Sequence, residues 1–376
     1  MDPGLISLLP FLITFQLLFV GIFLITHKKG SRRNNILLGF IFLLMAWNMG
    51  DLTLQIHGVA FKWEFLQHID DGFLLLYGPI FYLYAQGVIF RDFKLSPANL
   101  LHLVPYLLLT LSLLSMRNLR PVTSEEIINN DVPWQFYSVS ALIYVHFFIY
   151  LGLCYKSLWN YRKIIKDQYS QIDQINLDWL SFSLNTFGLV AVVSLIHNFI
   201  ALTNNAYVFM VTLFLLLIFV FYFVNRVILK ALRQPEIFAG IAQNETSKYR
   251  GSNLTPDQIE EYKKQLMALL VTEKPYLEPQ LSIADLSEML SLSTKHLSQV
   301  INQSFNQNFF DFINSYRISE VQQILQDTRD EKLTVLEAMF QAGFNSKSSF
   351  NTAFKKETGQ TPTEFRRKIA QMRSTS

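Results

Sequence analysis

The feature that most constrains this chain is residues 179–225, a stretch without a single Asp, Glu, Lys or Arg. One crossing of a ~30 Å bilayer core needs only about 20 apolar residues, so this stretch is long enough for two. The polar triplet Thr203-Asn204-Asn205 in its middle predicts the turn between them. Residues 3–27 are also free of charged side chains and predict a further span.

Seven segments altogether have the length and hydropathy of membrane spans. They are residues 5–26, 36–54, 65–88, 99–116, 137–158, 180–202 and 207–228. The first is predicted to be retained, because Asp2 precedes it and its positive cluster follows it, the reverse of a cleaved signal peptide. The sequence therefore predicts a seven-helix transmembrane bundle.

The positive charges of the short loops predict how this bundle is oriented. The loops after the first, third and fifth spans and the exit from the last contain Lys28, Lys29, Arg32, Arg33, Arg91, Lys94, Lys156, Arg162, Lys163, Lys166, Arg226, Lys230 and Arg233. The loops on the opposite side contain only Lys62, Arg117 and Arg120. We therefore expect a multi-pass protein of a bacterial inner membrane, with its N-terminus outside and its C-terminus in the cytoplasm.

Charge density marks a boundary near residue 245. The 29 acidic and 32 basic residues divide into 13 and 16 before residue 245 and 16 and 16 in the much shorter remainder. We expect a membrane domain over 1–233, a linker and juxtamembrane helix over 234–274, and a soluble domain over 275–370. The helix should begin after Thr255 and carry an apolar stripe that packs on the next domain or pairs two subunits. A single cysteine, Cys154, excludes a disulfide scaffold.

Two segments of the soluble part share one pattern. In residues 283–302 and again in 334–356, a short amphipathic helix is followed by a tight turn and a second helix with one apolar face. Ser291 and Gly343 stand at the two turn positions, and residues 309–325 between the units predict one long helix. This spacing predicts two helix-turn-helix units, and hence an all-α fold for the whole chain.

The region from about residue 275 to 367 resembles the DNA-binding domain of AraC/XylS-family transcription regulators. The resemblance rests on Leu297-Ser298-Gln299 in the first unit and on Gly343-Phe344-Asn345-Ser346-Lys347-Ser348-Ser349-Phe350, Phe354-Lys355-Lys356, Gly359, Thr361-Pro362 and Phe365-Arg366 in the second. The chain departs from the family pattern at Ser287, Met339, Asn306 and Val321; the bulk of Met339 predicts looser packing in the second unit.

The resemblance implies that two recognition helices enter successive major grooves. The expected contacts are Lys295, Ser298, Gln299 and Asn302 on the first helix, and Lys347, Ser348, Asn351 and Thr352 on the second. Gln, Asn and Lys suit this role, since they hydrogen-bond adenine and guanine edges. Beyond the second helix, Lys355, Lys356 and Arg366, with Arg367 and Lys368, form a basic patch suited to phosphates. Arg317 is expected to form a structural ion pair instead.

Ionisable side chains at the outer ends of the spans are candidates for sensing a signal. They are Asp51, His68, Asp70, Asp71 and His197, which either border an outward-facing pocket or only mark helix ends that reach water. No spacing typical of metal ligands or of a cofactor site accompanies them. We expect neither a metal nor a cofactor.

The pattern as a whole favours a membrane-embedded one-component transcription regulator over an enzyme, because no phosphate-binding glycine loop, kinase signature or nucleophile elbow is present. The expected partners are promoter DNA, the bilayer and an unidentified signal, with RNA polymerase and a second copy of the chain as further candidates. A passive membrane anchor and a transporter-like protein with a DNA-binding tail stay open as alternatives.

Overall fold

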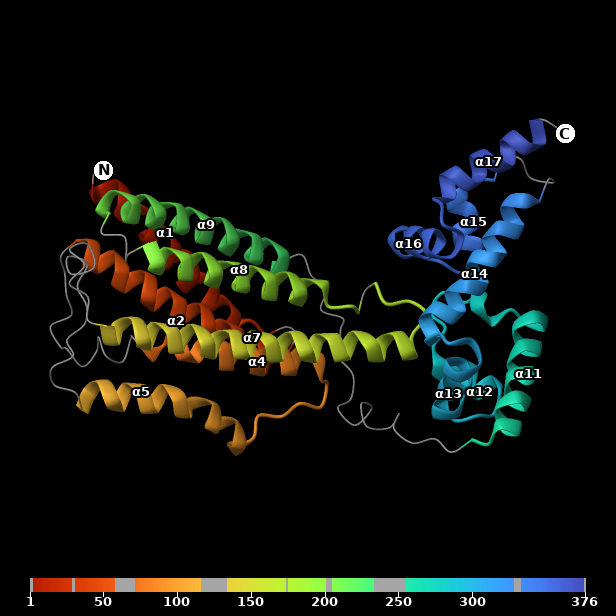
Figure 1. The fold of residues 1–376 in the computed structure, drawn as a ribbon, viewed down its shortest axis with the longest axis horizontal. Helices are drawn as coiled ribbons and strands as arrows, with labels where there is room; N and C mark the ends of the chain where they lie inside the picture. Colours follow the sequence, from red (N-terminus) through yellow and green to blue (C-terminus); the bar gives the residue numbers. More distant parts are fainter. Residues whose placement is uncertain are drawn as a thin grey trace. The chain divides into compact units, whose positions relative to one another are not determined.

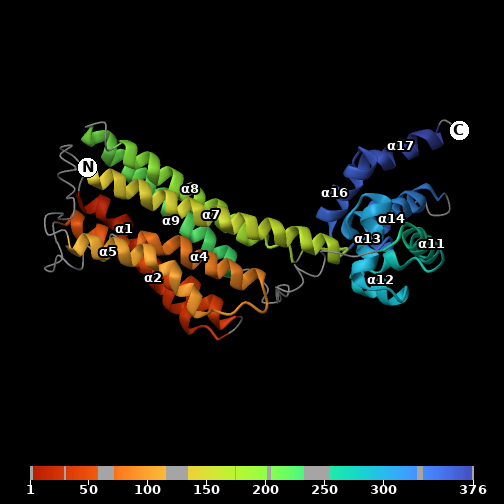
Figure 2. The same cartoon turned by 60° about the horizontal axis from the view of Figure 1, so that its bottom comes forward.

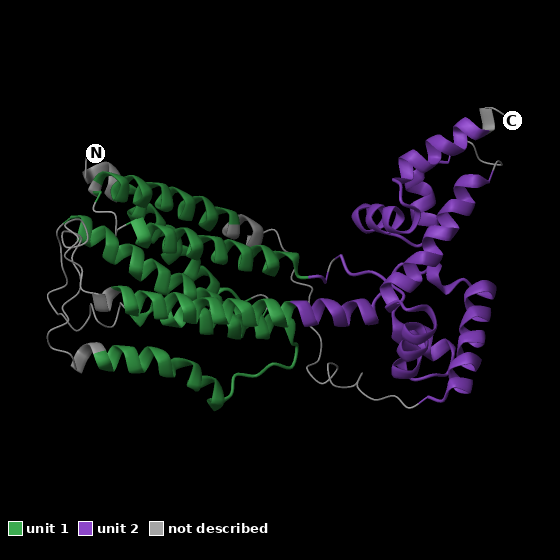
Figure 3. Ribbon diagram, viewed as in Figure 1, with its two compact units in different colours: residues 1–158, 177–243 green, residues 159–176, 244–376 purple. Residues whose placement is uncertain are grey.

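The computed structural model describes residues 3–28, 31–57, 72–115, 134–173, 175–200, 205–232, 254–327 and 333–374. The chain forms two compact units (Figure 3). The first contains residues 1–158 and 177–243, and the second contains residues 159–176 and 244–376. The second unit therefore includes a segment that lies between two apolar helices in the sequence.

The first unit is a bundle of apolar helices, labelled in Figure 1. They are α1 (Pro3–Thr26), α2 (Arg32–Ile56), α4 (Leu74–Ile89), η1 (Pro97–Leu103), α5 (Val104–Ser115), α7 (Trp134–Gln168), α8 (Asp178–Ile200) and α9 (Ala206–Leu232). Five of these, α1, α2, α7, α8 and α9, are long and apolar enough to cross a membrane, and α4 and η1–α5 are shorter apolar helices. Every predicted span overlaps one of them, while residues 65–71 of the third lie outside the described part.

Small residues and a shared apolar cluster hold α1 against its neighbours. A Cβ added to Gly39 of α2 would lie 2.9 Å from the carbonyl oxygen of Gly21 in α1, so the two backbones approach closely. Ile13 and Leu17 of α1 are fully buried in a cluster with Phe42 of α2 and residues of α9. Other side chains of α1, including Phe15 (65% exposed) and Phe19 (66% exposed), point away from the bundle.

Besides the end of α7, the described part of the second unit contains eight helical elements, and Figure 2 shows the unit from a second direction. They are α11 (Pro256–Thr272), η3 (Pro275–Leu277), α12 (Ile283–Met289), α13 (Thr294–Phe305), α14 (Phe309–Gln326), α15 (Val335–Gln341), α16 (Lys347–Thr358) and α17 (Pro362–Ser374). The first half of α14 shares a hydrophobic cluster with α11, α12 and α13. The second half of α14 shares another with α15, α16 and α17. The helix α14 thus joins the two predicted helix-turn-helix units.

The juxtamembrane helix α11 belongs to this core. Thr255 caps it in a capping box with Gln258, as the sequence predicts. Leu266 and Leu270 are buried at 0% and 1% exposure among residues of α12 and α13. The prediction that the helix packs on the next domain is confirmed, and the expected boundary at residue 275 cuts through a single core. These two leucines have no surface left for a second subunit.

Both turns have the backbone that the pattern requires. Ser291 between α12 and α13 has φ of 54°, and Gly343 between α15 and α16 has φ of 86°. A Cβ at Gly343 would lie 2.6 Å from the carbonyl oxygen of Leu277 and 2.7 Å from that of Tyr276, so only glycine fits without movement of the backbone. Met339 is 1% exposed inside the second cluster, which accommodates its bulk.

Candidate nucleic-acid interface

The first recognition helix, α13, is positioned by its cap and by one buried face. The hydroxyl oxygen of Ser293 accepts the backbone N–H of His296 at 3.2 Å and begins the helix. Leu297, Val300 and Ile301 are fully buried in the first cluster. The opposite face is therefore the one available to a ligand of the domain.

The predicted contacts on α13 divide into two groups. Lys295, Gln299 and Asn302 are partly or fully exposed. Ser298 is only 7% exposed, and both its carbonyl and its hydroxyl oxygen accept hydrogen bonds from the Asn302 amide. Ser298 therefore does not point outward as expected, because the helix turn places it beside Leu297 on the buried side.

The second recognition helix, α16, presents its predicted contacts more fully. Ser346 caps it by accepting the N–H of Ser349 at 3.4 Å, and Phe350 and Phe354 anchor it in the second cluster. The four predicted residues Lys347, Ser348, Asn351 and Thr352 are all exposed. The hydroxyl of Thr352 donates to the carbonyl of Ser348 at 3.0 Å, so both lie on one side of the helix.

The basic patch is arranged around α16 and α17. Lys355 is exposed and Arg366 is half-buried. The Lys356 ammonium forms an ion pair of 2.8 Å with Asp311 of α14, which leaves it less free for a phosphate than predicted. Hydrogen bonds from Thr361, and then the charges of Arg367 and Lys355, lower the pKa of Glu364. The patch is basic but contains its own carboxylate.

Arg317, in the middle of α14, is held by carbonyl groups. Its guanidinium donates to the carbonyl oxygens of Tyr276 at 2.6 Å and Glu278 at 2.7 Å, and lies 5.7 Å from the centre of the Phe344 ring. It makes no ion pair within the described residues, so the predicted ion pair is wrong. Burial lowers the pKa of Arg317 to about 10, so the side chain is still charged at neutral pH.

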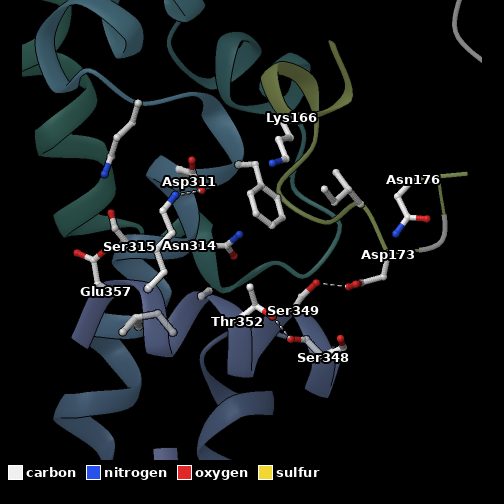
Figure 4. Close-up of a pocket in the computed structure, with 16 residues that line it drawn as sticks. Lys166, Asp173, Asn176, Asp311, Asn314, Ser315, Ser348, Ser349, Thr352 and Glu357 are labelled. Carbon is white, nitrogen blue, oxygen red and sulfur yellow. Dashed lines mark hydrogen bonds and ion pairs between the residues drawn. The ribbon is translucent and has the colours of Figure 1, made fainter. Parts of the chain in front are cut away.

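The segment that follows α7 contacts both helix-turn-helix units, the first through Leu281 and the second through Ser349. These contacts were not predicted from the sequence. Ser170, 2% exposed, donates from its N–H (3.2 Å) and its hydroxyl (2.6 Å) to the carbonyl of Leu281, and accepts from Arg317 at 3.1 Å. Asp173 accepts a hydrogen bond of 2.5 Å from the Ser349 hydroxyl (Figure 4). A hollow of about 290 Å³ lies between this segment, α14 and α16.

The predicted sensing residues are only partly described. His68, Asp70 and Asp71 lie outside the described residues. Asp51 accepts a hydrogen bond from Gln55 one turn later in α2. His197 in α8 contacts Thr212 of α9 at 2.9 Å. The outward-facing pocket stays a prediction, since the partners described for Asp51 and His197 are Gln55 and Thr212.

The first unit also contains a cavity that the sequence did not indicate. It has a volume of about 170 Å³, lies among α2, α4, α7 and α8, and is lined mainly by apolar and aromatic side chains such as Phe81 and Phe147. None of the predicted sensing residues lines it.

Comparison with known proteins places the second unit in a known class. Residues 286–368 match the model of a helix-turn-helix domain family. Over 86 residues, 23% of this chain, the sequence is 38% identical to an uncharacterized HTH-type transcriptional regulator of Staphylococcus aureus (strain COL), of whose length this covers 11%. Over 89 residues it is 29% identical to the Msm operon regulatory protein of Streptococcus mutans, covering 24% of this chain and 31% of that protein.

A comparison with solved structures matches a Listeria innocua protein of unknown function with 22% sequence identity. The match covers 28% of this chain and 93% of that protein, and its TM-score is 0.24. The sequence matches, with the two turns and the connecting helix described above, identify residues 286–368 as a helix-turn-helix domain similar to those of HTH-type transcriptional regulators. The chain spans about a tenth of the length of the first of these relatives.

Proposed function

We propose that this protein is a membrane-embedded one-component transcription regulator. Its helix-turn-helix domain binds promoter DNA in the cytoplasm, and its apolar bundle, crossing the membrane seven times, responds to an external or membrane signal. The observation that carries the proposal is the presence, in one chain, of helices long and apolar enough to span a bilayer and of a DNA-binding domain.

The surface chemistry of the first unit supports a lipid environment. Large apolar side chains of α1, such as Phe11, Phe15 and Phe19, are 58–66% exposed on the outside of the bundle. An apolar surface of this kind is costly in water and is matched by acyl chains. Seven crossings place the two ends of the unit on opposite sides, as the positive charges of the loops also predict.

The recognition helices support sequence-specific contact. Lys295, Gln299 and Asn302 on α13 and Lys347, Ser348, Asn351 and Thr352 on α16 are the side chains that we assign to base edges. Lys355 and Arg366 are assigned to phosphates. The helix α14 fixes the two recognition helices in one rigid frame, which suits successive major grooves of a duplex.

A chromatin immunoprecipitation experiment in the native host tests the proposal. The full chain, tagged after Ser376, should be recovered from the membrane fraction and should enrich a small set of promoter fragments. The double variant Gln299→Ala/Lys347→Ala should lose this enrichment while still reaching the membrane. As a matched control, Gln265→Ala/Lys264→Ala changes the same residue types on the exposed part of α11 and should leave enrichment unchanged. Equal enrichment of the promoter fragments by the Gln299→Ala/Lys347→Ala variant and by the control variant would contradict the proposal.

A further inference from the structure

The segment 159–176 is built into the DNA-binding unit rather than merely tethered to it. It consists of the end of α7 and the loop that follows, and it clusters with residues 244–376. Tyr169 pairs with Ser282 in an isolated antiparallel bridge. The buried Ser170 completes the hydrogen bonds of the guanidinium of Arg317. The loop thereby contacts the helix that connects the two helix-turn-helix units.

The same loop places a carboxylate at the beginning of the second recognition helix. Asp173 accepts the hydrogen bond from Ser349, which lies in the first turn of α16. The first turn of a helix carries free N–H groups and a partial positive charge, and DNA phosphates bind there for that reason. A carboxylate on the hydroxyl of this turn offers α16 the charge and the acceptor atoms that a phosphate would offer.

The loop and DNA also require the same side of α16. Ser348, Thr352 and Lys356 line the hollow that the loop encloses, together with Asp173 and Asn176 (Figure 4). Ser348 and Thr352 belong to the side chains that we assign to DNA, and Lys356 belongs to the predicted basic patch. A duplex that reached them would meet the loop and the negative charge of Asp173, which repels phosphates.

We infer that the face of α16 containing Ser348, Ser349 and Thr352 is shared by two mutually exclusive ligands, promoter DNA and the loop 169–176 of the same chain, with Asp173 acting as a phosphate mimic. This inference rests on the proposed DNA-binding function. Because α7 is one continuous helix from Trp134 to Gln168, the loop is joined directly to an apolar helix of the first compact unit. A displacement of the apolar part of α7 would therefore change how the loop docks on α16. The membrane unit would thus control how much of the α16 face is open to DNA.

The affinity of the full chain for DNA tests the inference. The protein is reconstituted in lipid nanodiscs, and its Kd for an enriched promoter fragment is measured at 150 mM salt. Asp173→Asn removes a charge-assisted hydrogen bond and so raises the fraction of molecules in which the loop is undocked and the α16 face is open to DNA. The Kd for DNA should therefore fall about five- to tenfold. Asp167→Asn replaces a carboxylate six residues earlier that does not line the hollow, and it should change the Kd less than about twofold.

Substitution of Ser349, the hydrogen-bond partner of Asp173, provides a second test. If its hydroxyl serves the loop, Ser349→Ala should lower the Kd as Asp173→Asn does, and the double variant should gain little more than either single change. A weaker affinity in Ser349→Ala would mean that this hydroxyl serves DNA and would overturn the inference. So would an unchanged or higher Kd in Asp173→Asn.

A reversible cross-link measures the competition itself. In a Cys154→Ala background, the pair Asp173→Cys/Ser349→Cys should form a disulfide that abolishes DNA binding, and a reductant should restore it. Added promoter DNA should slow the formation of this disulfide several-fold. Equal rates with and without DNA would show that loop and duplex bind together, which contradicts the inference. If even the reduced chain and the Asp167 control bind no DNA, the proposed function itself fails.

Discussion

The turn at Gly343 provides the sharpest test of the packing that positions the second recognition helix. Replacement by alanine forces a side chain into the left-handed region at φ of 86°. The new methyl group would lie 2.6 Å from the Leu277 carbonyl oxygen and 2.7 Å from that of Tyr276. The Tyr276 carbonyl also accepts from Arg317, so displacing it strains a second buried interaction.

The expected cost follows from two contributions. A non-glycine residue in the left-handed region costs about 1–2 kcal/mol. Overpacking against backbone that has to move adds about 1–3 kcal/mol. Gly343→Ala should therefore lower the free energy of unfolding by about 2–5 kcal/mol, a large part of the ~5–15 kcal/mol that stabilises a domain.

Gly359 at the end of α16 is the matched control. Its φ is 74°, but nothing lies within 4 Å of an added Cβ. Gly359→Ala should therefore cost only the backbone contribution of about 1–2 kcal/mol. The assay is urea unfolding of fragment 254–376, followed by circular dichroism, since both hydrophobic clusters lie within residues 254–369. Equal destabilisation by the two substitutions would refute the close packing of this turn on residues 276 and 277.

Three further predictions use the same fragment. Gln299→Ala or Lys347→Ala should cost ~1–3 kcal/mol of discrimination and relax the preferred sequence, whereas Lys355→Ala should weaken binding to all duplexes and lower the slope of the salt dependence by about one. Leu266→Ala should lower the free energy of unfolding by about 2–5 kcal/mol, while Val271→Ala, at a position 69% exposed on the same helix, should change it by less than about 0.5 kcal/mol. Hydrogen bonds from Thr334 lower the pKa of Glu337, so the ionised carboxylate stabilises the folded state at pH values above the ordinary pKa of glutamate. This stabilisation is lost as the pH falls through the lowered pKa. Between pH 7 and pH 3, the free energy of unfolding should therefore fall less in Glu337→Gln than in the wild type.

Local patterns account for how much of the second unit could be predicted. Cap residues, apolar spacing and turn positions are short-range signals, and they predicted α11, both turns and the long helix α14. Ser298 shows the limit of this reasoning, because helical spacing places a residue within a few tens of degrees and the depth of the core decides whether it is buried. The partners of Arg317 were missed for a related reason: they are backbone carbonyls, which every residue carries and which leave no mark in a sequence.

The loop 169–176 could not be assigned by reading the chain in order. Its charged and polar residues lie between two apolar spans and have the composition of an ordinary connection. The contacts of Ser170 with Leu281 and of Asp173 with Ser349 join residues more than a hundred positions apart. Such contacts arise from tertiary packing, and only a structure can bring them together.

Binding of DNA to membrane vesicles of known sidedness tests the central claim most directly. Inner-membrane vesicles that contain the full chain are prepared both inverted and right-side-out, and the retention of labelled promoter fragments is compared with that of vesicles lacking the chain. The account predicts sequence-specific retention by inverted vesicles, whose outer surface is the cytoplasmic face, and none by right-side-out vesicles. Retention by right-side-out vesicles alone, or recovery of the DNA-binding chain outside the membrane fraction, would contradict it.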